Sequence, residues 1–329
     1  MRALVTGATG FIGGHVAAEL RRGGYEVRAL VRAGSDRRNL EGLDVEPAVG
    51  DLLDPDSLRR ALQGCDYMFH VAAAYAFWAP EPGRIHAVNV LGTRNALLAA
   101  RAAGVQRVVY TSTESTIGIV GERDLGSEDP PLPPAHLVGD YKQSKYRAEQ
   151  LALHLCREGV VPVVVVNPTT PVGPGDVKPT PTGQVIVDFL RGRMPAYVDT
   201  GLNLVDVTDV ARGHVLALER GRIGERYLLG NRNLTLQALL GLLSQITGLP
   251  APRWRMPHTL ALALGYASQF VADRITHRPP RVPLAAVRVS RHCRYFDCAK
   301  AVRELGLPQS PIEPALERAV QWFRSNGYA

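Results

Sequence analysis

The sequence predicts an α/β fold in which a doubly wound parallel sheet is covered by helices on both faces. Short β-type runs alternate with helical stretches through the first half of the chain, which is the pattern of a parallel sheet. A glycine-rich turn over residues 7–13 joins the first strand to the first helix. With 329 residues, of which 46% are hydrophobic and 21% charged, the chain has enough material for a large core.

The elements of the first half follow one another in regular order. Glycines stand directly after three of the expected helices, at Gly23, Gly104 and Gly159, where a C-terminal glycine belongs. A further strand is expected just before Asp51. We expect the other strands at 3–5, 26–31, 67–71, 107–110 and 160–166, and the helices at 11–22, 57–62, 90–103 and 141–157.

The second half has a less regular pattern. Residues 167–182 are rich in proline and glycine, so we expect a loop there rather than a helix or strand. A short strand is expected at 226–229. Helical spacing predicts a smaller, mainly helical region with helices at about 183–192, 207–220, 235–247, 258–275 and 312–325.

Composition and charge exclude several classes of protein. Arginine supplies 34 of the 38 basic residues and is spread along the chain, and aromatic residues are only 6%, so we expect no nucleic-acid partner. The four cysteines form no CxxC pair and no cluster with histidine, so we expect no metal site and reduced thiols. The start has no apolar leader, and we find no run of about 18 apolar residues, so we expect a cytoplasmic protein.

The turn VTGATGFIG predicts a dinucleotide-binding site. Gly7, Gly10 and Gly13 let the backbone approach a pyrophosphate, which then rests on the N-terminus of the following helix at Phe11 and Ile12. This spacing differs from the G-x-G-x-x-G of many dinucleotide folds, but the turn directly follows a strand and precedes an amphipathic helix. An ordinary strand-to-helix turn would not need three glycines.

The second and third strands end in further candidate cofactor residues. Where NAD-selective folds place an acid on the ribose, this chain has Arg32, with Ser35, Arg37 and Arg38 close behind. An arginine cluster suits a 2′-phosphate, so we expect NADP(H) to be preferred and NAD(H) to remain usable. Asp51, followed by Leu52, would accept from the adenine amine or else cap a turn.

The segment YKQSK predicts a catalytic pair. Tyr141 and Lys145 stand four residues apart at the start of a helix, so both side chains share one face. A neighbouring ammonium lowers the pKa of a phenol, which can then exchange a proton with a substrate oxygen during hydride transfer. An exposed helix pair is the alternative. Candidates to hold the substrate oxygen follow the strand at 107–110, namely Thr111, Ser112, Thr113 and Ser115.

These motifs together resemble the extended short-chain dehydrogenase/reductases, also called the NAD(P)-dependent epimerase/dehydratase family. The matches are TGATGFIG, GDLLD, DYMFHVAA, VNVLGTRN, RVVYTST and YKQSK, in the usual order over roughly the first 170 residues. The resemblance implies a seven-stranded Rossmann sheet over 1–170, with returns near 204–230, and a substrate-binding region over most of 171–329.

The resemblance also implies roles for particular residues. Tyr141 would be the general acid/base, Lys145 the proton shuttle and ribose contact, and Thr113 the carbonyl-binding hydroxyl. His70 and Ala72 would line the cofactor, with a packed histidine as the alternative for His70. Asn89 would sit near the active site, and Pro168, after the sixth strand, is a further cofactor contact.

A narrower resemblance links the chain to the hopanoid-associated sugar epimerase (HpnA-like) group, and more distantly to plant dihydroflavonol reductases. It rests on SDRRNLEGLDVE, NPTTPVGPGDVKPTPTG and GRMPAYVDTGLNLVDV. We expect an NADPH-dependent reductase that acts on a sugar-like or hopanoid-linked sugar carbonyl. A sugar epimerase or dehydratase with retained NAD and a non-catalytic cofactor sensor are the alternatives, and homodimer formation stays open.

The stretch 258–275 is apolar nearly all round and is followed by arginines. Such a helix is normally buried, so we favour a core helix of the substrate region. The alternative is peripheral docking on an anionic membrane at its inner face, through an apolar body and a basic edge. The two interpretations differ in whether Leu260 and Leu264 are buried.

Overall fold

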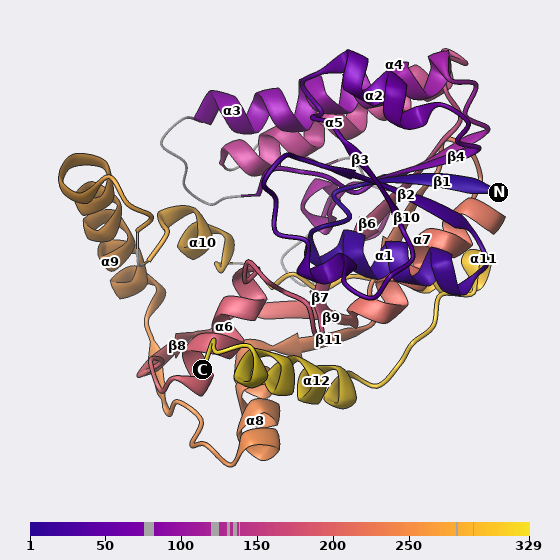
Figure 1. The fold of residues 1–329 in the computed structure, drawn as a ribbon. Helices are drawn as coiled ribbons and strands as arrows, with labels where there is room; N and C mark the ends of the chain where they lie inside the picture. The colour runs from indigo at the N-terminus through magenta and orange to yellow at the C-terminus, as the bar shows by residue number, and fades with distance from the viewer. Residues whose placement is uncertain are drawn as a thin grey trace.

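Seven parallel strands form the central sheet in the order β10-β6-β5-β4-β1-β2-β3 (Figure 1). The computed structural model describes residues 1–75, 82–119, 125–129, 132–133, 137, 139–280, 282–291 and 293–329. The sheet confirms the predicted α/β class. Its strands are β1 (Arg2–Thr6), β2 (Glu26–Val31), β3 (Glu46–Val49), β4 (Tyr67–His70), β5 (Arg107–Thr111), β6 (Val163–Pro168) and β10 (Arg226–Leu229).

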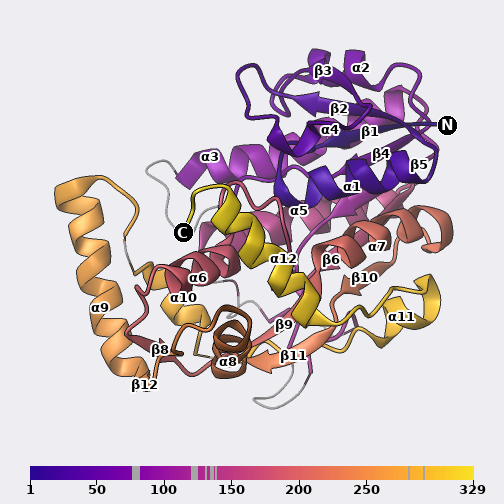
Figure 2. The ribbon, with the colours of Figure 1, turned by 60° about the horizontal axis from the view of Figure 1, so that its bottom comes forward.

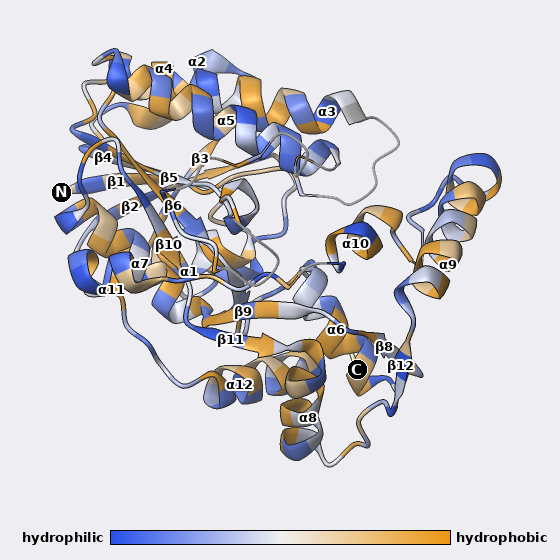
Figure 3. Ribbon diagram, turned by 180° about the vertical axis from the view of Figure 1, so that it is seen from behind, coloured by the Kyte–Doolittle hydropathy of each residue, from blue (hydrophilic) through white to orange (hydrophobic). Residues whose placement is uncertain are grey.

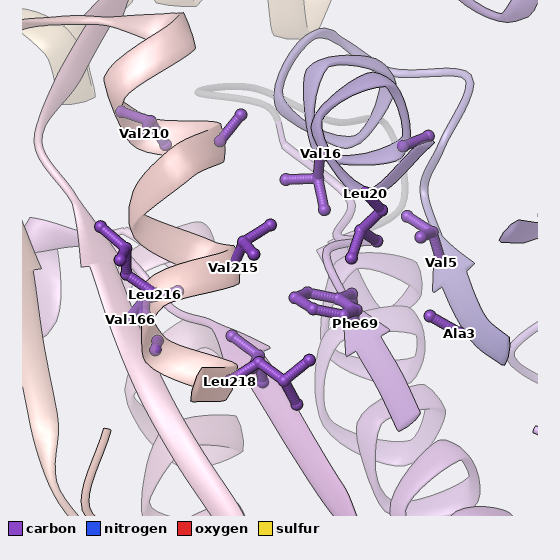
Figure 4. Close-up of a cluster of buried hydrophobic side chains, with 14 of the residues drawn as sticks. Ala3, Val5, Val16, Leu20, Phe69, Val166, Val210, Val215, Leu216 and Leu218 are labelled. Carbon is purple, nitrogen blue, oxygen red and sulfur yellow. The ribbon is translucent and has the colours of Figure 1, made fainter. Parts of the chain in front are cut away.

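Helices cover both faces of this sheet and bury two apolar clusters against it. Helices α1 (Phe11–Arg22) and α7 (Val207–Arg220) pack side by side on one face, where Val16, Leu20 and Val215 meet Phe69 of β4 (Figure 4). The other face carries α2 (Pro55–Leu62), α4 (Gly92–Ala102) and α5 (Asp140–Arg157). Burial on both faces explains why strands such as β6 read as continuous apolar runs.

Two predicted segments differ from the structure. The helix expected at 90–103 starts earlier, as α3 (Pro82–His86) and a π-helical turn, η2 (Ala87–Leu91), that run into α4. The loop expected at 167–182 holds a short strand, β7 (Thr170–Val172), and α6 (Pro181–Leu190) begins at its end. The prolines misled the prediction because Pro171 lies within the short β7 and Pro181 occupies the first turn of α6, where proline is tolerated.

A smaller region packs below the carboxyl ends of the strands (Figure 2). Its three-stranded sheet, β11-β9-β7, is completed by β9 (Gly201–Asp206) and β11 (Arg232–Thr235), and a second small sheet pairs β12 (Trp254–Met256) with β8 (Ala196–Val198). Helices α6, α8 (Leu236–Thr247) and α12 (Ile312–Ser325) enclose a separate apolar core around Phe189 and Phe323. Helix α11 (Ala299–Leu305) instead packs on α7.

The apolar stretch that follows β12 forms an arm at the edge of the molecule. It consists of α9 (His258–Val271), its π-helical extension η5 (Ala272–Thr276) and α10 (Leu284–Val289), and α9 stands away from the central sheet (Figures 1 and 2). Leu260 is 51% exposed and Leu264 is 43% exposed, so the prediction of a buried core helix is wrong. Among the described residues, no helix is long and apolar enough to cross a bilayer.

Candidate active site

Two glycines of the turn between β1 and α1, Gly7 and Gly13, leave no room for a side chain. Gly7 has φ +72°, and a Cβ there would lie 2.7 Å from the backbone of Ala72. A Cβ on Gly13 would lie 2.1 Å from the Gly7 carbonyl oxygen. The Gly10 N–H donates to that same oxygen at 2.9 Å, which closes the turn. These contacts explain the glycine at positions 7 and 13 from backbone packing alone, while a Cβ on Gly10 would lie 3.2 Å from the Gly7 carbonyl oxygen.

The turn also presents the N-terminus of α1. Its N-cap residue, Gly10, offers no side-chain oxygen, and its first turn holds no acid, so the positive end of the helix dipole is not offset. Phe11 turns its ring edge-on to His15 at 5.9 Å, and Ile12 packs against the core, so both would meet a phosphate through their backbone N–H groups. The residues present therefore fit a dinucleotide pyrophosphate.

The loop after β2 holds an exposed arginine and an internal ion pair. Arg32 is exposed, and its carbonyl accepts from the Ser35 hydroxyl at 2.9 Å. Arg38 is paired with Asp36 at 2.7 Å, which lowers the pKa of that carboxyl. Two members of the predicted arginine cluster, Arg32 and Arg37, are thus exposed and form no ion pair with any described residue, while Arg38 already has a partner.

The loop after β3 shows the turn role that the sequence left open for Asp51. One carboxylate oxygen of Asp51 accepts from the Leu53 N–H at 2.8 Å. Leu52 is buried, and its Cβ would lie 2.9 Å from a Cβ placed on Gly92 of α4. Contacts of Asp51 and Leu52 with adenine remain predictions.

Tyr141 lies in the first turn of α5, directly behind Gly139, whose φ of +86° turns the chain into the helix. Its phenol lies close enough to the Thr113 hydroxyl for that group to lower its pKa, and its ring meets that of Tyr75 edge-on at 4.3 Å. Burial raises the pKa of Tyr141, the carboxylate of Glu114 raises it further, and the Thr113 hydrogen bond lowers it. Tyr141 is therefore a protonated phenol at neutral pH, the state that a general acid requires.

Lys145 is buried one helical turn further on. Its Nζ donates to the Thr111 carbonyl at 2.8 Å and to the Tyr110 hydroxyl at 3.2 Å. Burial lowers the pKa of Lys145 to about 8, against the opposing effect of Glu149. The sequence predicted that this ammonium lowers the pKa of Tyr141, whereas burial of the phenol dominates and the pKa is raised. The side chain of Lys145 turns toward the end of β5 instead.

The four candidate hydroxyls after β5 have different interaction partners. Thr111 hydrogen bonds with the buried ring of His214 at 2.9 Å, and Ser112 is buried with its hydroxyl 3.4 Å from that of Thr116. The Ser115 hydroxyl contacts the carboxylate of Glu114 at 3.4 Å. Of these four hydroxyls, that of Thr113 acts on the pKa of the Tyr141 phenol, which favours it as the partner on the substrate oxygen.

A buried polar network fixes the backbone of Thr113 through its carbonyl group. The Thr113 carbonyl accepts from Asn167 Nδ2 at 3.0 Å and from the Thr116 hydroxyl at 2.8 Å. Both donors also bind Glu149, which is fully buried on α5 and paired with Arg226 at 3.2 Å. Because Glu149 lies on the same helix as Tyr141, this network couples the loop after β5 to the catalytic helix.

The other predicted site residues, which lie on neighbouring elements, make structural contacts of several kinds. Both ring nitrogens of His70 bind hydroxyls, Thr6 at 2.8 Å and Thr93 at 3.0 Å, and burial lowers the His70 pKa to about 3. The structure thus shows His70 in the packed role. Asn89 binds both backbone groups of Ala74 and the Ser144 hydroxyl. Ala72 lies against Gly7, and Pro168 ends the buried β6, at the cofactor edge of the sheet.

Sequence reasoning missed several groups that shape the site. Tyr110 accepts from Lys145, and Tyr75 packs on Tyr141. Arg294, far along the chain, forms an ion pair with Glu114, beside the phenol. Tyr110 precedes the hydroxyl motif directly, which was an available signal, but no spacing rule pairs Arg294 with a residue 180 positions earlier.

The fold and the site together define a dinucleotide-dependent α/β enzyme with a Tyr–Lys pair and a hydroxyl partner. Residues 3–230 match the NAD dependent epimerase/dehydratase family. The chain belongs to this family and is an NAD(P)-dependent reductase/epimerase of the short-chain dehydrogenase/reductase superfamily.

Three relatives illustrate the likeness. The chain is 49% identical over 328 residues to "Putative dihydroflavonol 4-reductase" of Synechocystis sp., covering 98% of this chain and 95% of that protein. It is 36% identical over 328 residues to "Sterol demethylase protein B" of Methylococcus capsulatus, covering 99% of each. The crystal structure of gox2253 superposes with a TM-score of 0.88 at 46% identity, covering 99% of this chain and 98% of that one.

Proposed function

We propose that this protein reduces the carbonyl group of a sugar-like or lipid-linked sugar substrate with NADPH, and that Tyr141 donates the proton. The observation that carries the proposal is the placement of the Tyr141 phenol in the first turn of α5, edge-on to Tyr75 and next to Thr113, with burial keeping it protonated. Reduction needs an acid at the substrate oxygen, whereas an epimerase or dehydratase begins by oxidising an alcohol and needs a base there. A phenol that is protonated at rest can donate directly to a carbonyl oxygen, so we favour reduction, and the fate of the cofactor distinguishes the two reactions.

Each side chain has a definite task in this reaction. A bound NADPH supplies the hydride that adds to the carbonyl carbon. Thr113 donates a hydrogen bond to the carbonyl oxygen and stabilises its developing charge, and Tyr141 passes its phenolic proton to that oxygen to complete the alcohol. Lys145 lies one helical turn further on, where its Nζ is held by Thr111 and Tyr110. Its ammonium would have to turn toward Tyr141 to stabilise the remaining phenolate until it is reprotonated.

The cofactor preference rests on Arg32. It stands exposed where β2 ends, in the position at which NAD-selective folds carry an acid. A guanidinium there suits a 2′-phosphate. The resemblance to the hopanoid-associated group supports a particular substrate, the aldehyde that forms when a ribose-like ring opens. Reduction of this aldehyde yields a polyol.

The deciding experiment follows the cofactor through turnover. The purified protein is mixed with NADPH or NADH and a panel of short sugar aldehydes, ketones and lipid-linked sugars, and cofactor oxidation is recorded. We expect stoichiometric release of NADP⁺ with an aldehyde substrate. Tightly retained NAD⁺ that co-purifies and cycles without net oxidation would establish the epimerase alternative instead.

A further inference from the structure

The α9 arm packs on the molecule with its small residues and turns its large ones outward. Ala261 and Gly265 are buried, and a Cβ on Gly265 would lie 3.3 Å from Leu284 of α10. This arrangement is the reverse of an ordinary surface helix, which buries its large apolar residues. The large side chains that α9 and η5 expose are Leu260, Leu264, Tyr266, Phe270, Val271 and Ile275, which we call the outer face.

The outer face is broad rather than a single stripe. At 100° per residue, Leu260, Leu264 and Val271 fall on one flank of the helix, while Tyr266 and Phe270 fall on the other. Leu260 is 51% exposed and Phe270 is 62% exposed, so neither flank is covered by the rest of the described chain. Figure 3 shows α9 at the margin of the molecule, next to α10. Exposed large apolar residues gathered in this way mark an interaction surface.

The excess positive charge of the protein is concentrated beside this face. Residues 253–294 hold eight arginines and one acid, Asp273, which gives +7. Thirty basic and thirty acidic residues remain in the rest of the chain, so this segment accounts for the whole net charge of +7. Within it, Arg255 pairs with Asp199 and Arg294 with Glu114, and Arg281 lies outside the described residues. The arginines that are exposed and described are Arg253, Arg274, Arg278, Arg288 and Arg291.

The basic and apolar groups are in direct contact. Arg288 of α10 donates from its guanidinium to the Tyr266 hydroxyl at 3.0 Å, with its charge 5.6 Å from the ring centroid. Arg274 lies in η5 and Arg278 just beyond it, at the end of the outer face. Trp254, 78% exposed on β12, lies four residues before α9. Aromatic and basic side chains around an apolar helix suit the boundary between lipid headgroups and acyl chains.

We propose that the α9 arm docks on the surface of an anionic lipid bilayer, with the outer face in the acyl boundary and the arginines on the headgroups. With 14 residues, α9 is about 21 Å long, too short to span a bilayer but suited to lying in its plane. A second copy of this chain would bring two segments of +7 together, which charge repulsion opposes. Helix flanks exposed on both sides also suit a fluid surface better than a single groove.

The test is flotation of the full chain with vesicles. Vesicles of phosphatidylcholine alone are compared with vesicles containing roughly one third phosphatidylglycerol, between about 0.05 M and about 0.5 M salt. We expect binding to the anionic vesicles only, falling about tenfold or more across this salt range. Absence of binding to anionic vesicles at low salt overturns the proposal.

Matched variants separate the outer face from general effects. Leu264→Glu with Phe270→Glu should reduce vesicle binding about tenfold or more, whereas Ile223→Glu, at a site 53% exposed elsewhere, should not. Arg274→Glu with Arg278→Glu should also reduce it, while Arg94→Glu with Arg101→Glu changes the net charge equally on α4 and should not. Equal loss in both charge variants means non-specific attraction and overturns the proposal.

Two further readouts complete the test. Light scattering that shows a dimer which Leu264→Glu dissociates would assign the outer face to a second copy, against the proposal. Turnover of a short water-soluble substrate should stay within about twofold of wild type in every arm variant, because the substituted side chains are exposed on α9, on η5 and just beyond it. Vesicle binding does not depend on the reaction, so it can fail or succeed independently of the proposed function.

Discussion

The Tyr141 site and the α9 arm use the same residue types in opposite ways. Around the site, large side chains such as Phe69 and Tyr110 are fully buried, and polar groups such as Glu149 find partners inside the protein. On the arm, Phe270 and Leu260 face outward and arginines line the edge. The first region builds a rigid site for one reaction, and the second offers a surface whose partner lies outside the chain. Burial, rather than composition, separates them.

The largest expected difference between the two regions is in stability. Phe69→Ala should lower the free energy of unfolding by about 3–5 kcal/mol, because it leaves a cavity in the buried core around Phe69. Phe270→Ala, at a position 62% exposed, should change it by no more than about 0.5 kcal/mol. Urea denaturation of both variants measures the contrast. Comparable losses would mean that α9 is packed in solution.

Within the site, Tyr141→Phe should have the largest effect on catalysis. Removing the phenolic proton donor should lower turnover by about two orders of magnitude or more, while the ring still packs on Tyr75. Steady-state kinetics with NADPH measure the loss, and cofactor titration should show binding retained. Near-normal turnover in a folded variant would remove Tyr141 from the acid role.

We expect the hydroxyl of Thr113, rather than its methyl group, to contribute to turnover. Thr113→Val should lower turnover by about 10- to 100-fold, because the donor to the substrate oxygen is lost, whereas Thr113→Ser should keep most of it. Ser112→Ala is the control, since the Ser112 hydroxyl contacts Thr116 rather than Tyr141. A dead Ser112→Ala with a neutral Thr113→Val would shift the assignment by one residue.

Cofactor preference should respond to the exposed arginine after β2. Arg32→Asp should shift the ratio of kcat/KM for NADPH over NADH by about tenfold toward NADH, about 1.4 kcal/mol, because a carboxylate repels the 2′-phosphate. Arg101→Asp, on the far helix α4, should leave the ratio unchanged. A wild-type protein that already prefers NADH by a clear margin would overturn the NADP assignment.

The smallest expected effect is on the pH profile. Burial lowers the pKa of Lys145 to about 8, so its ammonium is lost as pH rises through about 8, and kcat/KM for reduction should fall there. Glu149 opposes this shift, so Glu149→Gln should move the alkaline limb to lower pH, by about one unit or less. A limb that moves upward, or stays in place, would show that Lys145 does not set it. No such change is expected in vesicle binding.

Much of the sheet, and the candidate site residues on one helix, could be predicted because their signals are local. Strands and helices alternate over short stretches, and the residues within each stretch predict its structure. β2 and α1, for example, have the bounds that were predicted. The Tyr141–Lys145 spacing places two side chains on one helix face without reference to the rest of the chain. The division of the chain near residue 170 into two functional parts stays a prediction.

By itself, the sequence determined the α/β class, the glycine turn and the shared helix face of Tyr141 and Lys145, since turn geometry and helical period depend on neighbouring residues. Tertiary structure alone decided which hydroxyl meets Tyr141, that Lys145 turns to Tyr110, and that burial raises the Tyr141 pKa. It also decided that α9 is exposed, although its apolar sequence predicted a buried helix. An apolar pattern shows which residues avoid water, but only the packing of distant segments determines whether protein covers them.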